Sequence, residues 1–222
     1  MPANRTQPIA MTLALFACAA VLSAERTPFA KAYEDEAFKI WYMHWQPRAA
    51  PVEPYRHHGA AVAVFLEGGT LRLSSGATEV HTAGDVVYYA PDGIANTGEL
   101  VTSAPARALI AEFGTLPSWP ASAFPGITPA FPRANAATLL ENAAVRVWDL
   151  QYRPDQPLPA HVYLKHTVQV WLTEAVIERG HPNEPLHQEA RARGQFEIVH
   201  AGNVMSERVL GGQAHVVAIE PK

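Results

Sequence analysis

The hydrophobic positions of the chain fall in short runs, with no long helical period. The runs are rich in Val, Ile, Tyr, Trp and Phe, and Gly or Pro interrupts them. Examples are residues 61–66, 70–73, 78–82 and 86–89, with turn signals at 67–69 (EGG) and 74–76 (SSG). Short β-branched and aromatic runs at regular spacing are typical of strands. The pattern therefore predicts an all-β fold, either a sandwich or a barrel.

The order of these runs repeats about halfway along the chain. Ile40-Trp41 matches Val147-Trp148 at an offset of 107 residues, and residues 64–66 (VFL) match residues 170–172 (VWL) at an offset of 106. Residues 107–113 (RALIAEF) and 214–220 (AHVVAIE) are the expected closing strands of the two copies. This nearly constant offset predicts two copies of one all-β unit of roughly 75–85 residues.

The boundaries of the two copies follow from composition. We expect the first copy at 36–113 and the second at 138–222, joined by a proline-rich linker at 114–137. The prolines of the linker exclude a regular helix or a central strand. They are Pro117, Pro120, Pro125, Pro129 and Pro132. The polar segment 178–193 also contains two prolines and is predicted to be a long hairpin loop within the second copy.

The first 24 residues have the pattern of a secretory signal peptide. Arg5 is the only charge before Glu25, and an apolar stretch from Ile9 to Leu22 precedes Ser23-Ala24. The stretch is too short to span a bilayer as a helix. Cleavage after Ala24 predicts a periplasmic or secreted protein with no transmembrane segment. Two alternatives are a lipoprotein anchored at Cys18, because residues 15–18 (LFAC) resemble a lipobox, and an uncleaved anchor.

Composition narrows the classes of partner. The chain of 222 residues is 48% hydrophobic and 17% charged, with a formal net charge of −4. No basic cluster is visible, which argues against nucleic acid as a partner. Cys18 is the only cysteine, so no disulfide is predicted and stability must come from the core.

Two segments carry a resemblance to a known family. Residues 84–96 (GDVVYYAPDGIAN) and 194–205 (GQFEIVHAGNVM) each open on a glycine, continue as a strand and end in a tight turn around Gly93 or Gly202. They resemble the second motif of the cupin superfamily. In that motif the third residue after the turn glycine is a histidine that binds a metal. Asn96 and Met205 stand at that histidine's position. The resemblance implies two tandem jelly-roll β-barrels, frequent homodimers, and functions that range from dioxygenases and isomerases to binding proteins.

The first cupin motif, a His-x-His pair followed by a glutamate, is also incomplete. The matching pairs are Tyr55 and His57 in the first copy, and His161 and Tyr163 in the second. Alternate residues of a strand face the same side, so each pair would enter its barrel. The later glutamate is absent from both copies, which leaves one of four ligands in each. One imidazole does not hold a first-row metal ion.

The sequence therefore predicts a small-molecule binding module without a complete metal site. The candidate residues at the barrel mouths are Tyr55, His57, Tyr88, Asn96, His161, Tyr163 and Met205. We expect the pocket in the first copy, because it keeps the turn Pro91-Asp92-Gly93 and Asn96 offers a hydrogen bond. His57 and His58 are adjacent, so only one of them enters the barrel.

Three alternatives remain at this stage. The first is a divergent metal-dependent cupin enzyme, of dioxygenase or isomerase type, that holds Fe, Mn, Ni or Zn through His57 or His161. The second is a Cu(I) site formed by His161 and Met205, because soft ligands suit that ion. The third is a purely structural or oligomeric role, for which no sequence feature argues.

Export makes one direct prediction. Intact-mass analysis of the protein from its native host should give a chain that starts at Glu25. A lipid-modified N-terminus at Cys18 would support the lipobox alternative, and a full-length cytoplasmic form would contradict both kinds of export.

Overall fold

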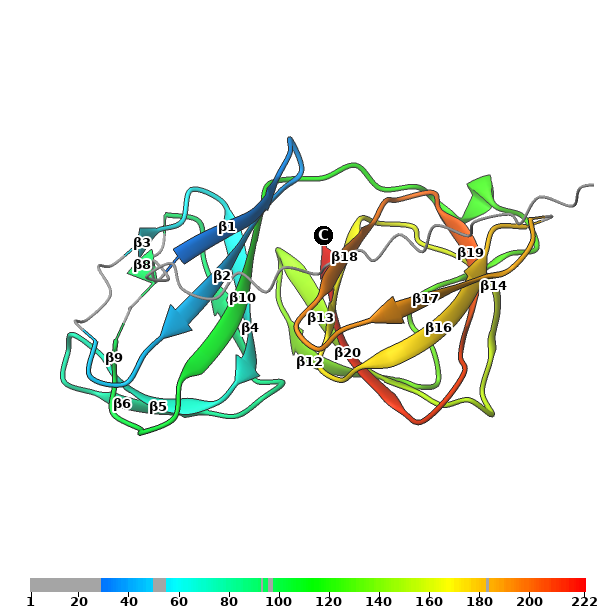
Figure 1. The fold of residues 1–222 in the computed structure, drawn as a ribbon. Coiled ribbons are helices and arrows are strands. Elements are labelled where there is room, and N and C mark those ends of the chain that lie inside the picture. The colour runs from blue at the N-terminus through cyan, green and yellow to red at the C-terminus, as the bar shows by residue number, and fades with distance from the viewer. Residues whose placement is uncertain (1–28, 50–54, 93, 96–97, 183) are drawn as a thin grey trace, which may run out of the picture.

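The computed structural model describes residues 29–49, 55–92, 94–95, 98–182 and 184–222 (Figure 1). The predicted signal peptide, Cys18, Gly93 and Asn96 lie outside these residues. Within them the fold is all-β, and its one helix is a short 3₁₀ turn, η1 (Ala121–Ala123). No helix in the described part of the chain has the length and apolar character needed to cross a bilayer.

The first half of the chain, residues 29–113, builds one large sheet and two small ones. The large sheet has the order β1 (Phe29–Glu34), β2 (Phe38–Trp45), β10 (Ala106–Phe113), β4 (Ala60–Glu67), β7 (Val86–Tyr89). One small sheet pairs β3 (Tyr55–Arg56) with β8 (Ile94–Ala95). The other has the order β6 (Thr78–His81), β5 (Gly69–Arg72), β9 (Glu99–Leu100). All the described pairings in this half are antiparallel.

The second half, residues 114–222, builds two five-stranded sheets. One has the order β12 (Ala136–Glu141), β13 (Val145–Tyr152), β20 (Ala214–Pro221), β15 (Thr167–Trp171), β18 (Phe196–Val199). The other has the order β11 (Thr128–Pro129), β14 (Leu158–Val162), β19 (Val204–Val209), β16 (Ala175–Gly180), β17 (His187–Arg191). The predicted hairpin loop at 178–193 is therefore wrong in part, because the end of β16 and all of β17 pair there as strands.

The proline-rich segment after β10 runs over the molecule from the first half to the far side of the second (Figure 1). It contains η1 and the two-residue strand β11, which lies at a sheet edge beside β14. This position suits proline, which has no N–H to donate to a neighbouring strand.

The two large sheets correspond in order and in hydrogen bonding. β10 lies between β2 and β4 in one sheet, and β20 lies between β13 and β15 in the other. The amide of Gly84 donates to the carbonyl oxygen of Phe65 at 2.8 Å, and the amide of Gly194 donates to that of Trp171 at 2.7 Å. These equivalent bonds fix β7 and β18 at the same place beside β4 and β15.

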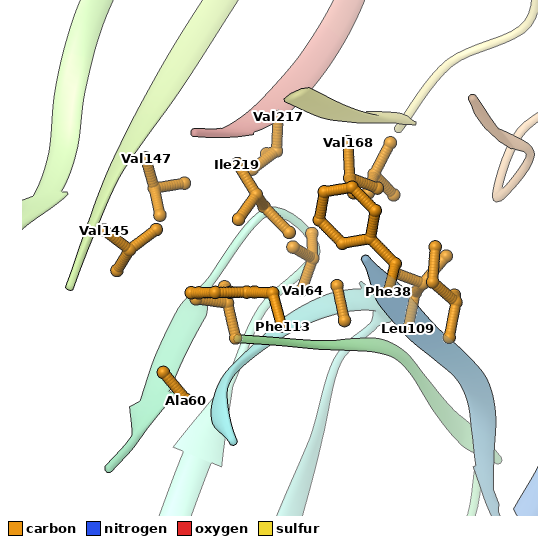
Figure 2. Close-up of a cluster of buried hydrophobic side chains, with 14 of the residues drawn as sticks. Phe38, Ala60, Val64, Leu109, Phe113, Val145, Val147, Val168, Val217 and Ile219 are labelled. Carbon is orange, nitrogen blue, oxygen red and sulfur yellow. The ribbon is translucent and has the colours of Figure 1, made fainter. Parts of the chain in front are cut away.

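The largest cluster of buried side chains lies between the two large sheets (Figure 2). Val64, Leu109 and Phe113 from the first half point toward Val168, Val217 and Ile219 from the second. The opposite face of β4 carries Ala61, Ala63 and Phe65 into a separate cluster inside the first half. β4 is buried on both faces, which explains why its sequence is a continuous apolar run instead of an alternating one.

Reciprocal contacts accompany this core. The Tyr42 hydroxyl donates to the carbonyl oxygen of Gly194 at 2.8 Å, and Arg193 donates through Nη2 to that of Leu66 at 2.7 Å. A Cβ atom on Gly194 would lie 3.1 Å from Leu66 Cδ1, and one on Gly84 would lie 3.2 Å from Leu172 Cδ1. The two halves therefore approach each other closely at the same place in each large sheet.

The tight turns after β7 and β18 differ in the residue that carries the left-handed conformation. Gly202 has φ of 90°, and in the first half Asp92 has φ of 58°. Counted from the paired strands on either side, Asp92 is the position that corresponds to Gly202. A Cβ atom on Gly202 would also lie 3.1 Å from Trp119 Nε1 in the proline-rich segment.

Replacement of this glycine tests the turn. Gly202→Val should destabilise the protein by about 1–3 kcal/mol, because a β-branched residue is strained at positive φ. Urea unfolding measures the change. Gly211→Val is the matched control, since nothing lies within 4 Å of a Cβ atom there. Equal stability of the two variants would contradict the expected strain.

Candidate functional site

The second half holds a buried histidine whose tautomer is fixed by its neighbours. His161 lies on β14 opposite Met205 of β19, next to an irregularity in the pairing of these strands. Its side chain is buried, and Nδ1–H donates to the carbonyl oxygen of Pro159 at 2.9 Å. In a neutral imidazole the other nitrogen is then an acceptor. Nε2 of His161 has no hydrogen-bond partner among the described residues.

A buried carboxylate faces this acceptor. Glu207 of β19 places Oε2 at 3.6 Å from His161 Nε2, and its side chain is 3% exposed. The same oxygen accepts a hydrogen bond from the Tyr152 hydroxyl at 3.3 Å. Burial lowers the pKa of His161, although the charge of Glu207 acts in the opposite direction. His161 is therefore neutral near pH 7, and two acceptors face each other with no donor between them.

An arginine is linked to this pair through Tyr152. Arg133 donates through Nη2 to the Tyr152 hydroxyl oxygen at 2.7 Å. Its guanidinium lies 5.1 Å from the ring centroid of Phe131 and 5.0 Å from that of Tyr152. Burial raises the pKa of Tyr152, while the charge of Arg133 opposes that rise. Arg133 therefore donates to Tyr152, and Tyr152 donates in turn to Glu207, the carboxylate beside His161.

A further buried pair extends the polar interior. Gln169 donates through Nε2 to the Tyr163 hydroxyl oxygen at 2.7 Å, and its Oε1 has no partner in the described part of the chain. The rings of Tyr163 and His161 are 5.3 Å apart. Burial raises the pKa of Tyr163 well above its usual value. Tyr163 therefore stays protonated and acts as a neutral hydrogen-bonding group.

A surface groove of about 350 Å³ lies on the outer face of the sheet that contains β14 and β19. Its lining combines apolar side chains with a few polar ones, namely Pro157, Leu158, Pro159, Leu186, Glu178, Ser206, Glu207 and Arg208. The pairing of β14 with β19 is irregular between Leu158 and His161, at the same place. Along β19, Ser206 and Arg208 face this groove, whereas the buried side chain of Glu207 faces the inner side of the sheet together with His161.

The first half also contains a buried histidine next to a carboxylate. His57 is completely buried, and its Nδ1 lies 3.3 Å from Oε2 of Glu112 on β10. The other oxygen of Glu112 accepts from the amide of Gly59 at 3.2 Å. Nε2 of His57 has no partner within the described ranges. The rings of Tyr55 and Tyr89 lie 5.1 Å and 4.9 Å from that of His57.

Burial also controls the protonation of this pair. It lowers the pKa of His57 more than the contact with Glu112 raises it. It raises the pKa of Tyr89 to about 12. His57 is therefore a neutral imidazole that donates from Nδ1, and its ring lies between those of Tyr55 and Tyr89.

The structure brings most of the candidate residues together within their own halves. Tyr55 lies beside His57, and His161 lies beside Tyr163. His57 is buried and His58 is exposed, in the short connection between β3 and β4. Met205 packs with Tyr163 in an apolar cluster.

One candidate was misplaced by the sequence. Tyr88 packs against the core between the two large sheets, and its neighbour Tyr89 is the residue that contacts His57. Tyr88 does not belong to the surroundings of His57 because successive strand residues face opposite sides. Tyr89 shares the inner face of β7 with Val87, two residues before it.

Sequence reasoning missed Glu112, Glu207, Tyr152 and Arg133. A signal existed for the carboxylates, because Glu112 is the single acid in the apolar run 108–113 and Glu207 alternates with Met205 on one face of β19. A buried acid in a strand needs a partner. Which histidine provides it depends on contacts between strands that are distant in sequence.

These residues do not fit the metal site that the cupin resemblance implies. His57 and His161 each face one carboxylate, and no group of three His, Cys, Asp or Glu side chains converges in the described part of the chain. A first-row ion bound by protein alone uses three or four such ligands. We therefore derive no chemical step through a metal at either histidine.

Comparisons with known proteins bear on the fold. No family model matches the chain, and no curated protein matches its sequence. Among solved structures, AerE from Microcystis aeruginosa has a TM-score of 0.60 at 11% identity, over 87% of this chain and 97% of that one. A cupin 2 conserved barrel domain protein from Leptotrichia buccalis has a TM-score of 0.54 at 8% identity, over 87% and 88%.

The fold is that of the cupins. A variant of salicylate 1,2-dioxygenase from Pseudoaminobacter salicylatoxidans agrees, with a TM-score of 0.58 at 13% identity over 83% of this chain and 71% of that one. Identities this low show a shared fold and leave the activity open. The cupin resemblance predicted from residues 84–96 and 194–205 is confirmed at the level of the fold.

The buried histidines make a prediction about acid stability. An unfolded histidine has a pKa near 6.5, and burial lowers that of His57 in the folded protein. As pH falls below about 6.5, the unfolded state binds the proton first, so stability decreases until the folded pKa is passed. The loss is about 1.4 kcal/mol for each pH unit between the two pKa values.

His57→Gln tests this effect. The variant should lose less stability between pH 7 and pH 5 than the wild type, whatever its stability at pH 7. Urea unfolding at both pH values measures the difference. Parallel changes in the two proteins would show that His57 does not contribute to the acid sensitivity.

Proposed function

We propose that this protein is an exported, two-repeat cupin-fold protein that binds a small organic molecule at His161 and Glu207. The ligand donates to both residues through an amino group, or to His161 alone through a hydroxyl group. Its apolar part packs against the rings of Tyr152 and Tyr163 beside this pair. This proposal moves the pocket from the first half, where the sequence favoured it, to the second.

One observation carries the proposal. The acceptor nitrogen of His161 and a carboxylate oxygen of Glu207 face each other at 3.6 Å, and both side chains are buried. A buried acceptor without a donor costs about 1–3 kcal/mol. A ligand O–H or N–H that donates to His161 Nε2 would remove that cost, and binding would gain from it.

The surroundings support the class of ligand. Arg133 and Tyr152 hold Glu207 as an oriented acceptor, and the ring of Tyr163 lies 5.3 Å from that of His161. Apolar walls with a few convergent polar groups are typical of small-molecule sites. An anionic ligand is disfavoured at this point because it would meet the carboxylate of Glu207.

The repeat is part of the proposal. The matching orders of the two large sheets, and the equivalent amide bonds of Gly84 and Gly194, support an origin of both halves from one cupin unit. We propose the boundaries 36–113 and 138–222 for the repeats, with the linker 114–137 between them. We also propose the homodimer that the cupin resemblance implies.

A metal-dependent enzyme is the second candidate. The cupin-fold structures that this chain resembles include the salicylate dioxygenase and a Bacillus subtilis oxalate decarboxylase with Mn(II) centres. An oriented imidazole next to a carboxylate, as in His57 and Glu112, favours a catalytic role in the first half. Elemental analysis of untagged protein decides the point: one Fe or Mn per chain, lost in His57→Ala, would establish this candidate.

The binding proposal is tested with a set of small alcohols, phenols and amines, paired with their methyl ethers or dimethylamines. The compounds with a free O–H or N–H should raise the melting temperature, and their methylated partners should not, because methylation removes the donor. In Glu207→Gln the stabilisation should disappear, since the new amide can itself donate to His161. Glu178→Gln is the matched control, as Glu178 lies on the neighbouring strand β16 and pairs with Arg208 on the outer face of the same sheet. Stabilisation that survives in Glu207→Gln would contradict the proposal.

A further inference from the structure

Two other histidines meet outside both buried pairs. His166 lies in the connection between β14 and β15, and His200 is the first residue after β18. Their Nδ1 atoms are 3.3 Å apart, and their ring planes are nearly perpendicular, at 87°. His200 is exposed and His166 is half-buried. The pair is therefore accessible from solvent, unlike His57 and His161.

The separation of the two nitrogens suits a shared metal ion. Imidazole nitrogens bind Zn²⁺ at about 2.0–2.1 Å in tetrahedral geometry. Two ligands at that length and angle are separated by about 3.3–3.4 Å, which matches the distance here. Without an ion, one Nδ1 must carry a proton and donate to the other. Moving that proton to Nε2 frees both lone pairs, and it is a change of tautomer with no net loss of a proton.

The charge around the pair favours a cation. Asp35 in the turn between β1 and β2 is held by the amides of Ala37 and Phe38, at 2.8 and 2.7 Å, and by the Tyr33 hydroxyl at 2.7 Å. The ring of Phe38 lies 6.4 Å from that of His166, which brings this turn beside the pair.

Electrostatics agree with that placement. The charge of Asp35 opposes the effect of burial, which lowers the pKa of His166, and His200 contributes to the lowered pKa of Asp35. Both effects place the carboxylate of Asp35 within electrostatic reach of the two histidines, where it favours the binding of a cation.

We propose that His166 and His200 bind one divalent transition-metal ion between their Nδ1 atoms, next to the negative charge of Asp35. Water completes the coordination, because the described residues bring no third His, Cys, Asp or Glu to ligating distance. Two imidazoles suit Cu²⁺, Ni²⁺ and Zn²⁺, with Cu²⁺ bound most tightly. The site is independent of the ligand proposed for His161 and Glu207.

The proposed metal site lies at the junction of the two halves. Asp35 belongs to the first half, and both histidines belong to the second. An ion bound there neutralises the charge of Asp35 across the junction and links the connection before β15 to the segment after β18. Metal binding should therefore also stabilise the folded protein, because an ion that binds only the folded state shifts the equilibrium toward it.

Titration of the untagged protein with CuCl₂, NiCl₂ and ZnCl₂ tests the inference. Calorimetry should show one site per chain, and electron paramagnetic resonance of the Cu²⁺ complex should show coupling to two imidazole nitrogens. His200→Gln should weaken binding by about tenfold or more, because it removes one of the two protein ligands. Asp35→Asn should weaken it less, since asparagine still accepts from the amides of the turn but lacks the charge.

His181→Gln is the matched control, since His181 is also exposed in the second half and bonds to the carbonyl oxygen of Val204. It should leave the affinity unchanged. Absence of binding by the wild type, or equal binding by His200→Gln, would overturn the inference. Loss of binding in His161→Gln instead would place the metal at the buried pair and would also contradict the metal-free ligand site proposed above.

Discussion

The packing of the two large sheets against each other is the constraint on which the rest of the structure depends. Each sheet offers valine, leucine and isoleucine side chains to the other, and these form the largest buried cluster of the molecule (Figure 2). Burial of one such side chain contributes about 1.5–3 kcal/mol. Because β4 and β15 are covered on both faces, neither can shift its register without moving apolar residues out of two cores at once.

This rigid centre fixes the residues on the inner face of each half. Glu112 lies on β10, between β2 and β4, so its carboxylate meets His57 at a position set by three strands. In the second half Glu207 comes from the opposite sheet, on β19, and meets His161 of the neighbouring strand β14. The two halves thus reach a similar pairing of imidazole and carboxylate from strands that do not correspond. By register, the counterpart of Glu112 is Glu220, which instead accepts a hydrogen bond from Trp148 at 2.9 Å.

Burial gives these pairs their chemical character. It lowers the pKa of both histidines and keeps the neighbouring tyrosines protonated, so each site is a set of oriented neutral groups beside one carboxylate. Such a set recognises hydrogen-bond donors. The exposed pair His166 and His200 has the opposite character, with two accessible nitrogens at a chelating distance and a negative charge nearby.

The sequence by itself determined the all-β class, the cupin resemblance and the facing of adjacent residues such as His57 and His58. These depend on local periodicity and turn chemistry, which a few consecutive residues contain. Only the tertiary structure decided which carboxylate meets which histidine, that Tyr89 and not Tyr88 contacts His57, and that His166 approaches His200. Those contacts join residues 34 to 55 positions apart, or depend on which face of a strand the neighbouring sheet covers. These contacts are set by the pairing of strands that are distant in sequence, and no local pattern in the chain specifies that pairing.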